Sequence, residues 1–124
     1  IDVSFISLKL ILPPLKNIIK ANGSVVALIK PQFEAGKDKV GKHGIIRDPK
    51  THEEVLKNTL GMAVESGYNV VGLDFSPIKG GEGNIEFLTH LVATNGEAKI
   101  AKSVSISKTL ESAYAQLNHA TKEK

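Results

Sequence analysis

The sequence contains no cysteine, so disulfide bonds and thiolate chemistry are both excluded. Long apolar runs are also missing, and none approaches the ~20 residues that a membrane-spanning helix needs. With 124 residues, of which 41% are hydrophobic and 23% charged, the chain has the composition of one globular domain. We therefore expect a soluble protein of the reducing cytoplasm without a membrane span.

Neither sign of charge predominates, since 16 Lys and Arg residues face 13 Asp and Glu residues. The net charge of +3 favours an anionic partner only weakly, so the positions of the bases matter more than their number. Four bases lie in the segment 31–47, which is longer than the ~4–6 residues of a usual connection. They are Lys37, Lys39, Lys42 and Arg47. This loop is either functional or an ordinary solvated face.

Several signatures of known sites are absent. The four histidines, His43, His52, His90 and His119, are scattered without the spacing of a ligand set, so no metal site is expected. The glycines of 80–83 precede a predicted strand and not a helix, which differs from the common phosphate-binding fingerprints. No Gly-x-Ser-x-Gly elbow is present, so hydrolysis by a serine triad has no support.

The spacing of apolar residues predicts an α/β fold. The expected elements are a strand end at 2–6, a helix within 8–19 that is kinked at Pro13 or begins there, a strand at 24–29, a helix from 48 to 66, strands at 68–76 and 85–93, and a last helix around 110–117. Strands separated by helices should run parallel, and the last strand, reached by a short loop, should run antiparallel. We expect three parallel strands and one antiparallel strand, flanked by helices.

The strand at 24–29 ends abruptly at Lys30. A continuous apolar run bounded by Gly23 and Pro31 is typical of a strand buried on both faces. Ligands of open α/β sheets bind outside the carboxyl ends of the strands, where Asp2 and Lys30 lie. An antiparallel last strand would bring Glu86 to the same edge. The alternative is that Lys30 only extends its charge into water.

Five stretches of the chain resemble the TlyA-type hemolysins and ribosomal RNA methyltransferases, which are relatives of the FtsJ ribose 2′-O-methyltransferases. They are Asp2–Ser7, Leu28–Glu34, the glycine spacing of Gly36–Gly44, Arg47–Pro49, and Ser76-Pro77 with Gly83-Asn84-x-Glu86. The resemblance runs from Asp2 to about Val92. We therefore assign residues 1–93 to the C-terminal part of such a domain and leave residues 94–124 unassigned.

The resemblance implies the C-terminal half of a Rossmann-like methyltransferase sheet that uses S-adenosylmethionine. The antiparallel strand should lie between the two strands that precede it. A Lys-Asp-Lys-Glu tetrad is implied at the ribose hydroxyl, with Asp2, Lys30 and Glu86 as its second, third and fourth members. The first lysine, the main cofactor-binding turn and a small RNA-binding domain would all precede Ile1.

Binding roles are hypothesised for further residues. Asp2, Ser4 and Phe5 are expected to contact the cofactor. The four bases of the 31–47 loop, Lys37, Lys39, Lys42 and Arg47, are expected to contact phosphates of ribosomal RNA or of a ribosomal subunit.

The chemistry explains these residue types. A ribose hydroxyl must lose its proton as it attacks a sulfonium methyl group, and lysine, with an unperturbed pKa of about 10.4, accepts that proton only when neutral. Neighbouring carboxylates favour the charged lysine, so the missing first lysine and the positive sulfonium should both help. We expect this chain alone to be inactive and the whole protein to be an enzyme.

Two alternatives differ in class. A hemolytic, membrane-active role is suggested by the family's older name, although no stretch has the pattern of a surface-seeking amphipathic helix. A module that binds RNA without methylating it is the other alternative, and the three expected polar residues argue against it.

Overall fold

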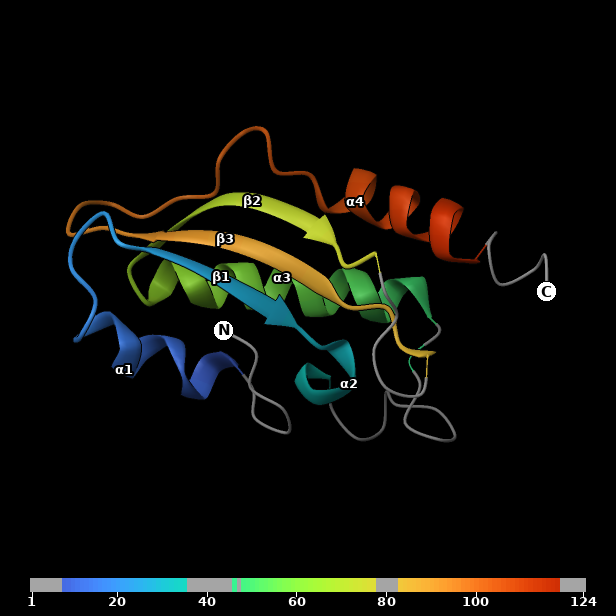
Figure 1. Ribbon diagram of the computed structural model, residues 1–124, viewed down its shortest axis with the longest axis horizontal. Helices are drawn as coiled ribbons and strands as arrows, with labels where there is room; N and C mark the ends of the chain where they lie inside the picture. The colour runs from blue at the N-terminus through green and yellow to red at the C-terminus, as the bar shows by residue number, and fades with distance from the viewer. Residues whose placement is uncertain (1–7, 36–45, 47, 78–82, 119–124) are drawn as a thin grey trace.

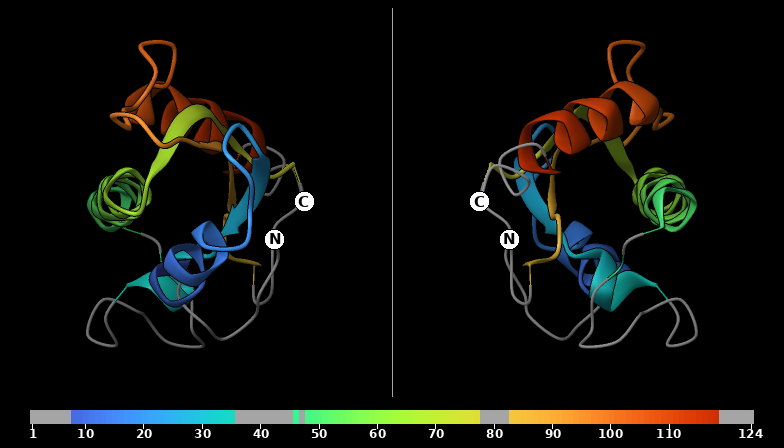
Figure 2. Two further views of the ribbon diagram at one scale, coloured as in Figure 1. Left: turned by 90° about the vertical axis from the view of Figure 1, so that its left-hand side faces the viewer. Right: turned by 90° about the vertical axis from the view of Figure 1, so that its right-hand side faces the viewer.

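The computed structural model describes residues 8–35, 46, 48–77 and 83–118. Its centre is a sheet of β1 (Ser24–Ile29), β2 (Tyr68–Phe75) and β3 (Phe87–Ala93), in the spatial order β1-β3-β2. Helix α3 (Pro49–Glu65) packs along one face of this sheet (Figures 1 and 2). The strand expected at 2–6 lies outside the described residues.

The described sheet is antiparallel, so the expected parallel pairing is wrong for these strands. β3 pairs antiparallel with β1 on one side and with β2 on the other. β1 and β2 run in the same direction, but β3 separates them. The reason is the short connection between β2 and β3, which allows β3 to fold back beside β2 as a hairpin. The position of β3 between its two predecessors is the one that the family resemblance implies.

Burial on both faces, as expected for β1, is also wrong. Val25, Ala27 and Ile29 are buried, but Val26 between them is 54% exposed. Helix α3 covers only the face that carries the first three residues (Figure 2). Burial therefore alternates along β1 although its sequence is continuously apolar. The side chains on the face opposite α3 are covered by no helix of the described residues.

The start of α3 confirms the sequence prediction. Asp48 is the N-cap, its Oδ1 accepts a hydrogen bond from the Lys50 backbone N–H at 3.0 Å, and Pro49 occupies the first helical position. The helix ends at Glu65, and Gly67 follows with φ of 95°. Val55, Leu56 and further apolar residues of the helix then face the sheet.

The N-terminal helical region is shorter than predicted. A 3-10 turn, η1 (Leu8–Leu10), precedes α1 (Leu12–Lys16), whose first turn contains both prolines. The prediction that a helix begins at the prolines is thus confirmed, and the kinked alternative is not. The left-handed residue before β1 is Asn22, with φ of 69°, and not Gly23.

The chain after Ala93 belongs to the same core. The backbone of Lys99–Ala101 runs beside β2, where Val70 N–H donates to the Lys99 carbonyl at 3.0 Å. Helix α4 (Ile106–Ala113) follows and continues as a π-helical turn, η5 (Tyr114–Asn118). Leu110 and Ala113 pack into the apolar cluster under the sheet. Within the described parts of the chain, no helix has the length and apolar character to cross a membrane.

Candidate functional site

Lys30 and Glu86 lie at the same end of the sheet, Lys30 directly after β1 and Glu86 directly before β3. The last paired residues of β1 and β3 are Ile29 and Phe87, and the same register continued by one position sets Lys30 opposite Glu86. On the other side, the Glu86 carbonyl accepts a hydrogen bond from Ser76 N–H at 2.8 Å. The structure therefore places two of the three predicted polar strand-end residues at the same end of the sheet.

A short helix after Lys30 shapes this end of the sheet. Helix α2 (Pro31–Glu34) was not predicted, and it forms because Pro31 fixes the first helical φ while the Lys30 carbonyl accepts from Phe33 N–H at 2.9 Å. The chain thus turns back directly after β1. This turn places the side chain of Gln32 against the start of β3.

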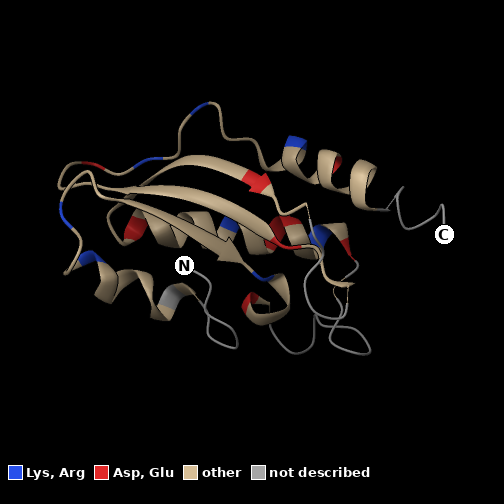
Figure 3. Ribbon diagram, in the orientation of Figure 1, with Lys and Arg blue, Asp and Glu red and all other residues tan. Residues whose placement is uncertain are grey.

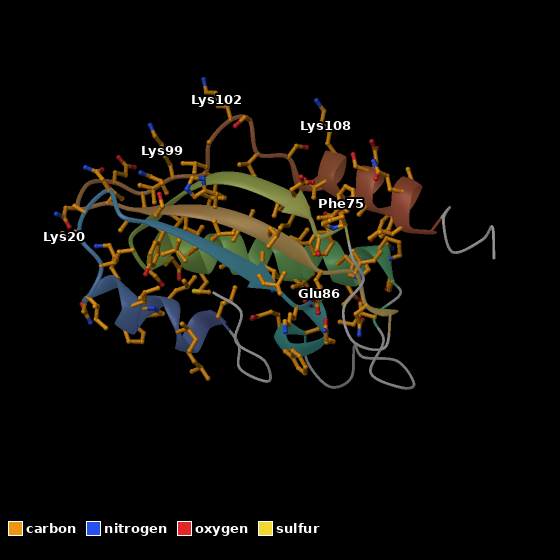
Figure 4. The ribbon with its side chains drawn as sticks, viewed as in Figure 1. Lys20, Phe75, Glu86, Lys99, Lys102 and Lys108 are labelled. Carbon is orange, nitrogen blue, oxygen red and sulfur yellow. The ribbon has the colours of Figure 1, made fainter. Side chains whose placement is uncertain are left out.

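The Glu86 side chain is held in a buried position beside α2 (Figure 4). Its exposed fraction is only 7%, and its Oε2 accepts a hydrogen bond from Gln32 Nε2 at 3.0 Å. A buried carboxylate needs such a donor, because desolvation without compensation is costly. Gln32 Oε1 is also buried, and it has no hydrogen-bond partner among the described residues. Within the described residues, Gln32 Oε1 is therefore an acceptor that a further O–H or N–H group could use.

Asn84 fixes the chain just before Glu86. Its side chain is 2% exposed, and its Oδ1 accepts a hydrogen bond from Ile46 N–H at 2.9 Å. Ile46 lies near the end of the segment 31–47 that carries the four bases, called the basic loop below. Asn84 therefore joins that loop to the start of β3. Asn84 was part of the motif that carried the family resemblance, but no role was predicted for it. The signal available was its spacing two residues before Glu86.

His52 and Tyr114 form a second, partly buried contact near this end. His52 lies on the inner face of α3 with 1% of its surface exposed, and its Nδ1 is 2.6 Å from the Tyr114 hydroxyl. Burial lowers the pKa of His52, while the charge of Asp48 and the backbone of Ile46 act in the opposite direction. Burial and the charge of Asp48 raise the pKa of Tyr114 to about 12. Both groups are therefore neutral at pH 7.

Sequence reasoning missed this pair. His52 was dismissed as a metal ligand, and its place three and four residues before Val55 and Leu56 was the sign of a buried helical position. The remaining predicted site residues lie outside the described part of the chain. They are Asp2, Ser4 and Phe5 for catalysis and cofactor, and Lys37, Lys39, Lys42 and Arg47 for RNA.

The last strand of the sheet is inserted antiparallel, and Lys30 and Glu86 lie at one end of the sheet. These features are expected of the methyltransferase class. The sequence profile described as FtsJ-like methyltransferase matches residues 1–93. The chain belongs to this family.

Similar proteins carry methyltransferase and hemolysin names. YqxC of Bacillus subtilis, provisionally named an rRNA methyltransferase, is 58% identical over 91 residues, which are 73% of this chain and 32% of that protein. The 16S/23S rRNA (cytidine-2′-O)-methyltransferase TlyA of Mycobacterium tuberculosis is 37% identical over 103 residues, which are 83% of this chain and 38% of that protein. The chain thus spans about a third of these curated relatives.

A solved structure has the same fold. It is that of a protein from Streptococcus thermophilus, provisionally named a hemolysin, with 48% identity and a TM-score of 0.92. The match covers 98% of this chain and 43% of that protein. It therefore includes the segment after Ala93, which lies beyond the residues matched by the family profile.

Proposed function

We propose that this chain is part of an enzyme that transfers a methyl group from S-adenosylmethionine to a ribose 2′-hydroxyl of ribosomal RNA. The observation that carries the proposal is the row formed by Lys30 and the buried, hydrogen-bonded Glu86. The name of the mycobacterial relative, an rRNA (cytidine-2′-O)-methyltransferase, supplies the substrate class.

Each residue has a defined part in this chemistry. The hydroxyl oxygen forms a bond to the methyl carbon as the bond from that carbon to sulfur breaks, and the hydroxyl proton must leave. Lys30 accepts or orients that proton. Glu86, which accepts a hydrogen bond from Gln32, orients the ammonium group or the hydroxyl.

The cofactor would supply a sulfonium methyl group. Its predicted contacts, Asp2, Ser4 and Phe5, lie outside the described residues. Among the described groups, the amide oxygen of Gln32 fits an O–H donor such as ribose, since it is a buried acceptor without a hydrogen bond in the described part of the chain. The described part of the site therefore fits the nucleophile.

The test is substitution of the two residues in the longer protein that contains this chain. With labelled S-adenosylmethionine and rRNA, Lys30→Ala should lower kcat by about 10²- to 10⁴-fold, the usual contribution of a positioned proton acceptor. Glu86→Gln should lower kcat too, because a neutral amide holds the lysine and the hydroxyl less strongly than a carboxylate does. Lys108→Ala, which removes an exposed lysine of α4, is the matched control and should turn over normally. Near-normal turnover of Lys30→Ala would contradict the role of Lys30.

A further inference from the structure

The amide of Gln32 faces the candidate carboxylate. Gln32 Nε2 donates to Glu86 Oε2 at 3.0 Å, and Glu86 is only 7% exposed. A carboxylate and an amide oxygen are both acceptors, so the NH₂ end of the amide has to be the end that faces Glu86. Gln32 belongs to one of the stretches that carry the family resemblance, but no role was predicted for it.

Helix α2 presents this amide from a fixed position. At the start of the helix, the Lys30 carbonyl accepts a hydrogen bond from Phe33 N–H at 2.9 Å. At its end, Glu34 Oε2 accepts a hydrogen bond from Leu8 N–H at 2.8 Å, which ties the helix to η1. Gln32 lies between these two attachments. Its side chain therefore extends from a short piece of backbone that is held at both ends.

Stability alone does not explain an amide at this position. Gln32 Oε1 is buried without a hydrogen-bond partner among the described residues, and an unpaired buried oxygen costs free energy. A methionine of similar length would fill the space without that cost. Glu86 is a buried carboxylate, which is also costly unless a donor compensates it. Polar pairs of this kind, retained at a cost in stability, are typical of functional sites.

We infer that Gln32 is a positioning residue, which fixes the direction in which Glu86 presents its carboxylate. The inference rests on the proposed function for its effect on methyl transfer, while the contact with Glu86 stands on the hydrogen bond alone. A bond between an amide and a carboxylate restricts the rotation of both side chains. Without it, the carboxylate would turn away from the lysine or the hydroxyl that it orients.

The test makes two substitutions at Gln32 in the longer protein and the same two at an exposed glutamine. Gln32→Met keeps the length of the side chain and removes the donor. Gln32→Glu keeps the shape of the side chain but supplies a donor only while the new carboxyl group is protonated. Gln116→Met and Gln116→Glu make the same chemical changes on an exposed side chain of η5 and serve as matched controls.

The first readout is methyl transfer to rRNA. Gln32→Met should lower kcat by about 10- to 100-fold, the range for a hydrogen bond to a charged group, and leave the KM for S-adenosylmethionine unchanged. Relative to wild type, Gln32→Glu should be more active at about pH 6 than at about pH 9, because adjacent carboxyl groups share a proton at low pH and repel each other when both are ionised. Wild-type kcat in Gln32→Met, or the same relative activity of Gln32→Glu at both pH values, would overturn the inference.

The second readout is the stability of the longer protein in urea, which requires no activity. Gln32→Glu should lose stability relative to wild type as pH rises from about 5 to about 8, because the folded state holds the shared proton more tightly than the unfolded state does. Gln116→Glu should follow the wild type. An equal response of the two variants would overturn the inference. A wild-type protein without methyl transfer to rRNA would instead contradict the proposed function, and this comparison would still decide whether Gln32 acts on Glu86.

Discussion

At the scale of single residues, the positions of some groups of the candidate site could be predicted from sequence spacing, and the positions of others could not. Lys30 and Glu86 were predicted to meet because the direction of each strand follows from the length of its connection. The contact of His52 with Tyr114 joins residues 62 positions apart, and that of Ile46 with Asn84 joins residues 38 apart. No local pattern encodes such partners, since they depend on how helices pack under the sheet.

Burial of His52 makes stability depend on pH. Its pKa is lower in the folded chain than in the unfolded chain, so the unfolded state binds a proton first as pH falls. The stability that the neutral ring contributes is complete above about pH 6.5 and is lost as pH falls through the folded pKa. Urea unfolding should therefore show a loss of stability between pH 7.5 and pH 5.5 that is smaller in His52→Gln. An equal loss of stability on acidification in wild type and His52→Gln would contradict the assignment to His52.

At the scale of elements, boundaries with clear capping residues were predicted well, and the exposure of whole faces was not. Asp48 and Pro49 mark the start of α3 because their chemistry is local. The two faces of β1 cannot be told apart by sequence, since Val26 is as apolar as its buried neighbours. The short helix α2 escaped prediction because four residues carry no helical period.

The contact of the basic loop with RNA remains a prediction. If Lys37, Lys39, Lys42 and Arg47 contact RNA phosphates, their joint neutralisation should reduce the slope of log K against log salt by about 3, since each contact contributes roughly 0.7–0.9. Salt titrations of rRNA binding by the longer protein measure this slope.

A second set of bases serves as the control. Lys99, Lys102 and Lys108 project from the outer edge beyond β2, on the side of the sheet away from β1 and α2 (Figures 3 and 4). Their neutralisation should change the slope less. The same slope for both sets of variants would contradict a specific role of the loop.

At the scale of the whole molecule, one apolar core joins the family domain to the segment that follows it. Tyr68, Phe87 and Leu91 lie in that core together with Leu110 and Ala113 of α4. The assignment of residues 94–124 as a separate, unassigned stretch stays a prediction, and the packing of α4 supports a role within the same body. Charge and composition did not predict that α4 packs into this core, because α4 is a short amphipathic helix like many others.

The family resemblance implies that the first lysine of the tetrad and the main cofactor turn belong to the longer protein, so we predict that the chain alone transfers no methyl group above background. The measurement is incorporation of labelled methyl from S-adenosylmethionine into rRNA, with the longer protein as the positive control. Incorporation by the chain alone would contradict this division of the site.

The central claim is most directly tested by locating the methyl group that the longer protein adds. Mass spectrometry of nucleosides from treated rRNA distinguishes a ribose 2′-O-methyl group from a methyl group on the base. The row of Lys30 and Glu86 predicts a 2′-O-methylated nucleoside, which Lys30→Ala should abolish. A methylated base, or a 2′-O-methyl group that survives in Lys30→Ala, would contradict the account.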